Sequence, residues 1–303
     1  MNDPRPAPRP AGLLYDDFGT GRHHESSLVR HALGSRHEEA LVAGLAGGIG
    51  FMYFVFEYAG RLPLPTIVAQ AHPDPWVPAA LDRLRVPYEV GRSSRPRWDR
   101  VHAALDDGRP VFCTVDRSGL PWHGAGDEMA GGDPYTVVLA GHTGDTLWVE
   151  DGDREPRRIS EEEFGAAWSG HRKGRHRMIV PTGPPAGEPD VEGAVAATAD
   201  RLTGPVLGNR FLAGTGRLHA CLEEEWTAPG ATRPLYADFL ELAGRPEAAA
   251  LFRESAGCWS AVARPARAAE PDADAEARAH LFDECAALVD SALALERRAV
   301  TLF

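Results

Sequence analysis

A run rich in proline and glycine at residues 181–189, Pro-Thr-Gly-Pro-Pro-Ala-Gly-Glu-Pro, separates two parts of different character. Short apolar segments typical of strands recur before this run, whereas helical spacing dominates after it, up to residues 275–302. Because proline and glycine interrupt regular structure, the run predicts a domain boundary. A chain of 303 residues is also long enough for about two domains. We therefore expect an α+β domain over residues 13–183 and an all-helical domain over residues 188–303.

The charge balance narrows the range of partners. The chain has 44 acidic and 32 basic residues, a net charge of −12, and residues 188–303 contribute −8 of it. Binding to a phosphate backbone requires a basic face, so nucleic acid is not an expected partner. Lys173 is the only lysine, which indicates a coding bias towards arginine, and the arginines are therefore not by themselves evidence of function.

The sequence predicts a soluble cytoplasmic protein. Residues 1–12 form a Pro/Arg-rich arm, expected to be disordered, without the apolar segment of a secretory signal. The longest uncharged apolar run, residues 40–56, is shorter than the roughly 20 residues that span a membrane. The four cysteines are far apart with no CxxC pair, so we expect no zinc site and no disulfide framework. No metal and no cofactor are predicted, and the oligomeric state is left open.

Local patterns predict the elements of the first domain. Helical spacing between Ser26 and Leu45, broken near Gly34, leads into a tight turn at residues 46–50 and a buried strand at residues 51–56. Further short strands are predicted at Thr66–Ala69, Val86–Val90, Val111–Val115, Thr136–Ala140 and Thr146–Glu150. The last two flank a hairpin connection at residues 141–145.

Two further patterns follow the hairpin. Ser160 and Glu163 have the spacing of a capping box and predict a helix that runs to about Trp168. Residues 171–180 predict a basic turn that leads into another strand. In the second domain, Tyr236 and Phe239 are three residues apart, so we expect them to share one buried face at the domain interface, with Arg233 and Asp238 as salt-bridge partners there.

The segment Gly21-Arg22-His23-His24-Glu25 immediately precedes a predicted helix. Because a helix N-terminus presents unpaired N–H groups and a positive end, it suits a developing anion or an activated nucleophile. The alternative interpretation is a surface loop in which Ser26 or Ser27 caps the helix.

A second group of candidates lies around the hairpin. Asp133, Pro134 and Tyr135 precede one of its strands and Asp151 follows the other, so antiparallel pairing brings these positions to one end of the sheet. Asp151 could orient a base, although acidic residues after a strand often serve as turn formers. Asp116, Trp122 and His123 follow another strand and could line a pocket, although a loop histidine is usually only solvated.

Several short segments follow one another between residues 23 and 151: His23–Leu28, Glu39–Leu41, Gly47–Phe51, Tyr53–Tyr58, Gly108–Val111, Asp116, Leu120–His123, Val137–Gly141 and Trp148–Asp151. In residue type and spacing this series resembles the N-terminal domain of the butirosin biosynthesis protein H family. The segment Arg233–Leu240, together with Trp259, resembles the helical domain usually fused to it.

The resemblance implies a papain-like, cysteine-peptidase-type fold for the first domain. It also implies an acyltransferase that moves an aminoacyl group from a carrier-protein thioester to an amine of an aminoglycoside, within natural-product biosynthesis. The expected partners are therefore an acyl carrier protein or acyl thioester and a small amine, which the acidic chain would attract.

The sequence departs from the family's pattern at two positions. His24 occupies the position of the reactive cysteine, Tyr135 occupies that of the histidine, and only the acid, Asp151, is retained. A Cys-His-Asp triad cannot be assembled from these positions. The candidate catalytic residues are His24, His23, Glu25, Tyr135 and Asp151, and the candidate substrate-binding residues are Asp116, Trp122, His123 and Glu57.

Two functions remain open after these departures. A thioester is already activated, so a transferase without an acyl-enzyme needs only a positioned base, here His24 or His23, and an oxyanion site. The alternative is a degenerate scaffold that binds a carrier protein or an intermediate without chemistry, and an amide or thioester hydrolase is a third option. Side chains that fill the cleft would favour the scaffold.

Overall fold

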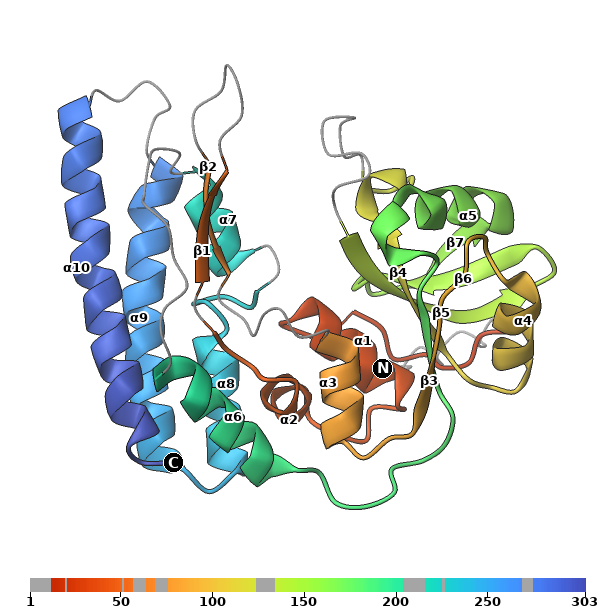
Figure 1. The fold of residues 1–303 in the computed structure, drawn as a ribbon, viewed down its shortest axis with the longest axis horizontal. Helices are drawn as coiled ribbons and strands as arrows, with labels where there is room; N and C mark the ends of the chain where they lie inside the picture. Colours follow the sequence, from red (N-terminus) through yellow and green to blue (C-terminus); the bar gives the residue numbers. More distant parts are fainter. Residues whose placement is uncertain are drawn as a thin grey trace, which may run out of the picture. The chain divides into compact units, whose positions relative to one another are not determined.

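A computed structural model of the chain describes residues 12–19, 21–50, 52–56, 64–68, 76–123, 134–203, 216–224, 227–268 and 275–303 (Figure 1). The chain forms two compact units, each built from separate segments. Unit 1 comprises Met1–Gly21, Ser27–Arg36 and Val86–Ala186. Unit 2 comprises Arg22–Ser26, His37–Arg85 and Gly187–Phe303. The division after Ala186 lies in the Pro/Gly run, whereas residues 37–85, assigned from the sequence to the first domain, cluster with the helical unit.

Unit 1 contains a six-stranded antiparallel sheet in the order β3-β8-β4-β5-β6-β7. Its strands are β3 (Tyr88–Gly91), β4 (Val111–Asp116), β5 (Pro134–Thr143), β6 (Thr146–Glu150), β7 (Arg157–Ser160) and β8 (Met178–Pro181). The predicted hairpin is confirmed, since Thr143 of β5 pairs with Thr146 of β6. The remaining strand, β7, was not predicted.

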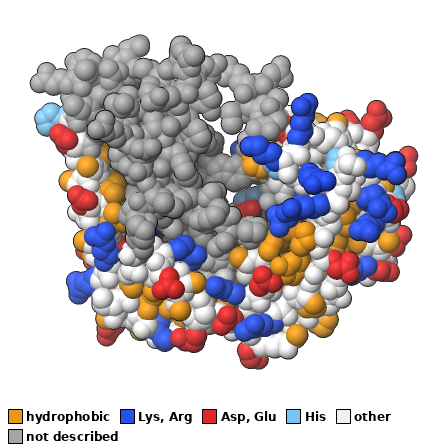
Figure 2. All heavy atoms as spheres, in the orientation of Figure 1, with side chains coloured by type: hydrophobic (Ala, Val, Ile, Leu, Met, Phe, Trp, Pro, Cys, Tyr) orange, Lys and Arg blue, Asp and Glu red, His pale blue; other side chains and the backbone are white. Residues whose placement is uncertain are grey.

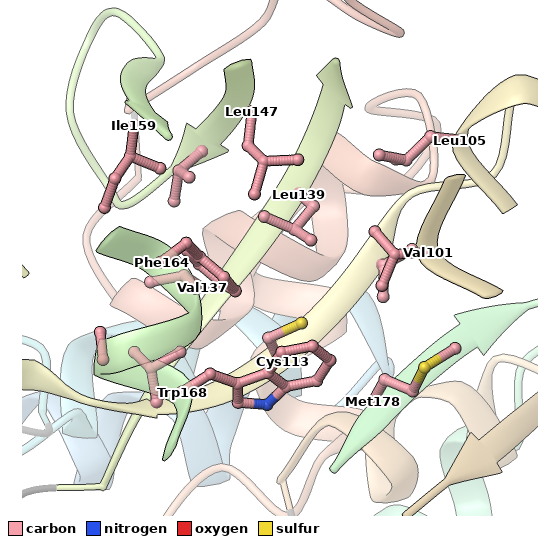
Figure 3. Close-up of a cluster of buried hydrophobic side chains, with 14 of the residues drawn as sticks. Val101, Leu105, Cys113, Val137, Leu139, Leu147, Ile159, Phe164, Trp168 and Met178 are labelled. Carbon is pink, nitrogen blue, oxygen red and sulfur yellow. The ribbon is translucent and has the colours of Figure 1, made fainter. Parts of the chain in front are cut away.

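One face of this sheet is covered by α4 (Trp98–Asp106) and α5 (Glu161–Gly170). Figure 3 shows Val137, Leu139 and Leu147 of the sheet opposite Phe164 and Trp168 of α5. The capping box is confirmed: Ser160 Oγ accepts from the Glu163 N–H, and Glu163 reaches back to the Ser160 N–H. The opposite face carries a smaller apolar cluster, formed by Leu13, Phe18 and Ala140 with Tyr15 and Trp148.

Helix α1 (His24–Ala32) begins with residues of unit 2 and continues into unit 1. The other elements of unit 2 are α2 (Glu39–Leu45), the antiparallel pair β1 (Met52–Phe56) and β2 (Leu64–Val68), α3 (Trp76–Arg83), α6 (Val191–Thr203), α7 (Gly216–Glu223), α8 (Arg233–Leu242), α9 (Pro246–Ala268) and α10 (Ala275–Val300). The long helices α9 and α10 pack along each other (Figure 1). The described elements after residue 186 are all helices, so the predicted α+β class with a helical C-terminal part is confirmed.

Helix α8 packs against α2 through two buried aromatic residues. Tyr236 and Phe239 are both fully buried, as predicted, with ring centroids 5.5 Å apart. Phe239 covers Gly44 so closely that a Cβ there would lie 2.0 Å from the ring. Tyr236 covers Gly48, which has a positive φ of 52°. The predicted tight turn is therefore confirmed. Glycine is needed there because any Cβ would collide with the aromatic ring that packs on the backbone.

Among the described residues, no helix has the length and apolar character needed to cross a membrane.

Candidate functional site

Three residues, Asp116, Tyr135 and Asp151, lie at one end of the strands of the unit 1 sheet because of its antiparallel register. Asp116 ends β4 opposite Pro134, and Tyr135 at the start of β5 lies opposite Val115. Asp151 follows β6, whose last residue pairs with Val138 of β5. The sequence-based prediction that Tyr135 and Asp151 share one end of the sheet is confirmed, whereas Asp133, which belonged to the same prediction, lies outside the described residues.

Asp151 is the centre of a hydrogen-bonded cluster. Trp122 Nε1 donates to Asp151 Oδ2, and His123 Nε2 lies 2.7 Å from the same oxygen. The Tyr135 hydroxyl also hydrogen-bonds to this carboxyl group. The Asp151 side chain is fully buried, whereas His123 keeps 17% of its side chain exposed. The carboxylate is thus shielded from water while the imidazole can be reached from outside.

The arrangement defines the protonation of the His123 ring. A carboxylate only accepts hydrogen bonds, so Nε2 carries the proton that bridges to Asp151. In the neutral imidazole, Nδ1 then holds the lone pair and is the basic atom. The ring of His123 is also packed edge-on against Tyr135, with centroids 5.0 Å apart. His123 is therefore oriented by one carboxylate and one aromatic face, as a general base requires.

Tyr135 remains a neutral phenol in this cluster. Burial raises its pKa well above the usual value, and the charge and hydrogen bond of Asp151 raise it further. The Arg117 guanidinium, 5.2 Å from the centre of the Tyr135 ring, acts in the opposite direction but does not outweigh them. The hydroxyl therefore serves as a donor to Asp151.

Asp116 lies at the same edge, on the side of α5. It is buried, and a Cβ on Gly170 would lie 2.9 Å from the Asp116 Cβ, so the end of α5 rests directly on this residue. Burial lowers the pKa of the neighbouring His171, whereas the charge of Asp116 opposes that change. Asp116 thus lies at the same end of the sheet as Tyr135 and Asp151, next to the loop that follows α5.

His23 caps helix α1 instead of facing an open site. Its Nδ1 accepts from the Ser26 N–H at 3.3 Å and lies 2.8 Å from Ser26 Oγ. The ring is buried and packs on Trp76 with centroids 4.8 Å apart. The expectation that Ser26 or Ser27 is the cap is therefore wrong, because the helix begins at His24 and both serines lie inside it.

His24 and Glu25 form the first turn of α1, and both are half-buried. Glu25 is an acidic residue at the positive end of the helix, where it is favourable. The predicted substrate-binding residue Glu57 lies outside the described residues. The edge cluster thus unites Tyr135, Asp151 and the predicted binding residues Trp122 and His123 within unit 1.

A second buried cluster, which the sequence interpretation missed, lies on the other side of β6. Glu150 is fully buried; its Oε1 is 2.5 Å from His31 Nδ1 and its Oε2 accepts from the Tyr15 hydroxyl at 2.5 Å. Burial raises the pKa of Glu150, while the hydrogen bonds from His31 and Tyr15 lower it without cancelling the effect of burial. The sequence feature that could have revealed the burial of Glu150 is the alternation of side chains along β6. Glu150 points to the same face of the strand as Trp148, and Leu147 points to the other face.

A cavity of about 370 Å³ lies in unit 2 and is lined mainly by carboxylates: Arg22, Glu38, Glu39, Ala40, Asp238, Glu241 and Leu242. Most of these carboxylates hold neighbouring elements. Glu39 Oε1 accepts the backbone N–H groups of Arg22 and His23, each at 2.7 Å. Asp238 accepts from Arg22 at 2.6 Å and from Arg253 at 2.8 Å. Asp238 is thus a salt-bridge partner, as predicted.

The cysteines do not supply a nucleophile to the sheet edge. Cys113 is buried inside β4, and burial raises the pKa of its thiol far above the usual value. The other three, Cys221, Cys258 and Cys285, belong to the helices of unit 2. Within the described ranges no group of three or more His, Cys, Asp or Glu side chains has the arrangement of a metal site.

Comparison with known proteins identifies one family. Residues 23–152 match the family "Butirosin biosynthesis protein H, N-terminal". No curated protein matches the sequence significantly.

Two solved structures show a distant likeness. A protein described as a C39-like peptidase from Bacillus anthracis is 14% identical, with a TM-score of 0.37, and the match covers 57% of this chain and 92% of that one. The peptidase domain of Streptococcus ComA, a bifunctional ABC transporter of a quorum-sensing pathway, is 15% identical, with a TM-score of 0.34, over 56% of this chain and 99% of that one.

The family match includes the start of α1 and every residue of the Asp151 cluster. The resemblance predicted from the sequence is confirmed over this segment: residues 23–152 match the model of the butirosin biosynthesis protein H N-terminal family.

Proposed function

We propose that this protein is an acyltransferase of natural-product biosynthesis that moves an acyl or aminoacyl group from a carrier-protein thioester to an amine. The observation that carries the proposal is the His123–Asp151 pair, with its 2.7 Å contact, inside the segment that matches the family. The family's name refers to butirosin biosynthesis, and the resemblance implies a papain-like domain that carries out acyl transfer.

The transfer proceeds without an acyl-enzyme. Tyr135 and His24 replace the histidine and cysteine of the family's pattern, and the buried Cys113 thiol is too weakly acidic to act as a nucleophile. A thioester needs no covalent activation by the protein, since its carbonyl already reacts with a neutral amine. What the protein must supply is a base and correct positioning.

His123 is the base in this proposal. Its Nδ1 accepts the proton from the amine nitrogen as that nitrogen attacks the thioester carbonyl. The C–N bond forms and the C–S bond breaks, and the imidazolium returns the proton to the departing thiolate. The products are an amide and the free thiol of the carrier.

Asp151 and its other donors act through His123. Asp151 keeps the Nε2 proton in place and stabilises the imidazolium that forms during transfer. Trp122 and Tyr135 in turn fix the carboxylate, since both donate to it. The buried Asp116 at the same edge is a candidate for holding the ammonium form of the acceptor.

The experiment follows amide formation from an aminoacyl thioester and an amine acceptor by intact mass and by thiol release. We expect His123→Ala to slow transfer by about 10²–10⁴-fold, the range for loss of a general base. Asp151→Asn should also lower kcat, because an amide cannot hold the Nε2 proton as a carboxylate does. His280→Ala, at an exposed position on α10, is the matched control and should transfer at the wild-type rate.

His24 is the alternative candidate for the base, because it occupies the position of the reactive cysteine in the family's pattern. The variant His24→Ala distinguishes this candidate from His123. Transfer that survives His123→Ala within about threefold but is lost in His24→Ala would contradict the proposal. Thiol release without amide formation would indicate a hydrolase, and thiol release by no variant would leave the binding scaffold as the function.

A further inference from the structure

Two segments of unit 1 carry several cations that have no carboxylate partner among the described residues. One is the loop at residues 171–177, His-Arg-Lys-Gly-Arg-His-Arg, between α5 and β8, and the other is the segment at residues 92–97 after β3. Five exposed cations lie on these segments and are called the basic surface here: Arg92, Arg95, Arg172, Lys173 and Arg175. In Figure 2, Lys and Arg side chains gather on the part of the molecule that carries unit 1.

Hydrogen bonds join the two segments into one surface. The Ser93 N–H donates to the Arg175 carbonyl at 2.8 Å, and His176 Nδ1 lies 3.1 Å from the Ser93 carbonyl oxygen. The strands beside them are paired as well, with Gly91 of β3 opposite Met178 of β8. The backbone segments that carry the five cations are therefore joined to each other.

The loop is held in a strained conformation. Arg175 and His176 have positive φ angles of 50° and 47°, which non-glycine residues rarely adopt. His176 is anchored by Ser169 Oγ, 3.0 Å from its Nε2, and by the edge-on contact with Trp168. Such strain persists where the surroundings determine the backbone, and it is concentrated at functional positions.

The charge of the basic surface is uncompensated. Within the described part of the chain, none of the five cations has a carboxylate within 4.0 Å, whereas Arg97 on the same segment pairs with Asp99 at 2.5 Å. Arg177, the last residue of the loop, has a lowered pKa because it is partly buried and because Arg92 repels its charge. On a chain with a net charge of −12, such a surface is an exception.

The basic surface adjoins the candidate site within unit 1. The loop begins at His171, directly after Gly170, which rests on Asp116. Asp116 in turn ends the strand that pairs with the first residues of β5, where Tyr135 lies. A partner held by the loop is therefore next to the edge that carries Tyr135 and Asp151.

We propose that the basic surface docks the protein that carries the acyl thioester, through an acidic face of that protein. This inference rests on the proposed function, since a donor attached to a protein needs a docking surface beside the reacting groups. Complementary charges steer such an encounter and set its orientation. Nucleic acid is a poorer fit, because the net charge of the chain repels a polyanion that extends beyond the surface.

The test reverses two charges on the basic surface. The variant is Arg172→Glu/Arg175→Glu, and the matched control is Arg297→Glu/Arg298→Glu, two exposed arginines of α10 with the same change in net charge. The probe is a holo acyl carrier protein with an acidic face around its prosthetic arm, loaded with an aminoacyl group. We expect its Kd to rise roughly tenfold or more in the variant, with a weaker dependence on salt, and not in the control.

A small donor separates docking from chemistry. With an aminoacyl-pantetheine thioester, the variant should transfer at the wild-type rate, whereas the carrier-bound donor should show a raised KM and an unchanged kcat. An equal loss of carrier binding in both double variants, no binding by the wild type, or a loss with the pantetheine donor would overturn the docking proposal. Tight binding of a single-stranded DNA oligonucleotide that is lost in the variant would overturn it as well. If neither donor reacts with the wild type, the proposed function fails, while the carrier Kd still tests the surface.

Discussion

Two neighbouring carboxylates at the end of β6 have opposite surroundings. Asp151 accepts from Trp122 and His123 at the sheet edge, and Glu150 accepts from Tyr15 and approaches His31 on the other side of the strand. Consecutive strand residues point to opposite faces, so one short segment serves both clusters. A second buried ionisable group, Glu150, thus lies one residue away from the Asp151 of the candidate site.

The raised pKa of Glu150 predicts a pH dependence of stability. The folded state binds the Glu150 proton more tightly than the unfolded state, mainly because of burial. This contribution to stability is therefore complete below the unfolded pKa of about 4.3 and is lost as the pH rises through the higher folded pKa. We expect the wild type to lose free energy of unfolding relative to Glu150→Gln as the pH rises through that window, measured by urea unfolding at several pH values.

A surface glutamate provides the control for this prediction. Hydrogen bonds from Ser160 lower the pKa of Glu163, so its contribution has the opposite sign and disappears as the pH falls. The wild type should therefore lose stability relative to Glu163→Gln on acidification. A pH profile for Glu150→Gln that runs parallel to that of the wild type would show that burial does not govern this carboxyl group.

Only part of the Asp151 cluster, and none of the Glu150 cluster, could be predicted from the sequence. Strand alternation and the hairpin predicted that Tyr135 and Asp151 would meet, because both positions follow from one local pairing. The same reasoning did not give His123 its role, since a short 3₁₀ helix, Arg117–Gly119, and a turn lead from β4 to it, and no strand pairing fixes their direction. The Glu150 cluster needs partners from residues 15 and 31, and no local pattern encodes contacts over such distances along the chain.

Elements with a strong local pattern were the ones predicted correctly. β4 is a nearly continuous apolar run, β6 has aliphatic residues at alternate positions, and α5 has a complete capping box. In contrast, β7 was missed because its first two residues, Arg157 and Arg158, are exposed and charged. This edge strand forms through its pairing with β6, which is a property of the sheet and not of the segment.

The turn after α2 gives a prediction at the scale of an element. Gly48 has a positive φ, and a Cβ there would lie 2.4 Å from the Tyr236 ring, so Gly48→Ala combines backbone strain with overpacking. We expect it to lower the free energy of unfolding by about 2–5 kcal/mol, from about 1–2 kcal/mol of left-handed strain and about 1–3 kcal/mol of overpacking. Urea unfolding of the purified variant measures the loss.

Gly34 is the matched control for this turn. It also has a positive φ, of 76°, but a Cβ there would meet no atom within 4 Å. Gly34→Ala should therefore show only the strain contribution, about 1–2 kcal/mol. Equal losses in the two variants would mean that the approach of Tyr236 to the turn adds nothing to the cost.

The division of the whole chain into units follows contacts that sequence order does not reveal. Residues 37–85 cluster with the C-terminal helices because Gly44 and Gly48 accept the aromatic face of α8. The Pro/Gly run marked the place where the chain passes into its helical part, since composition changes there. The Pro/Gly run carried no information about residues 37–85, which pack with the C-terminal helices although more than a hundred residues separate the two along the chain.

A buried ion pair connects four segments of unit 2. Arg233 of α8 donates to Glu296 of α10 at 2.7 and 3.0 Å, and also to the Gly50 carbonyl at 3.1 Å. Glu296 also accepts from Ser255 and Trp259 of α9, at 2.7 and 2.9 Å. Although burial raises the Glu296 pKa, the charge of Arg233 and these hydrogen bonds hold it below its usual range. The pair is therefore ionised at neutral pH and fully enclosed.

Removal of one partner should destabilise this unit strongly. Glu296→Ala leaves the Arg233 cation buried without its counterion, and such losses are about 3–5 kcal/mol. The control is Glu192→Ala, which breaks an exposed pair with Arg245 and should change stability by no more than about 1 kcal/mol. We would measure the free energy of unfolding in urea together with amide hydrogen exchange at residues 47–50. Because Arg233 holds the Gly50 carbonyl, exchange there should accelerate in Glu296→Ala alone; a change no larger than that of Glu192→Ala would mean that the ion pair does not fix residues 47–50 to the helices.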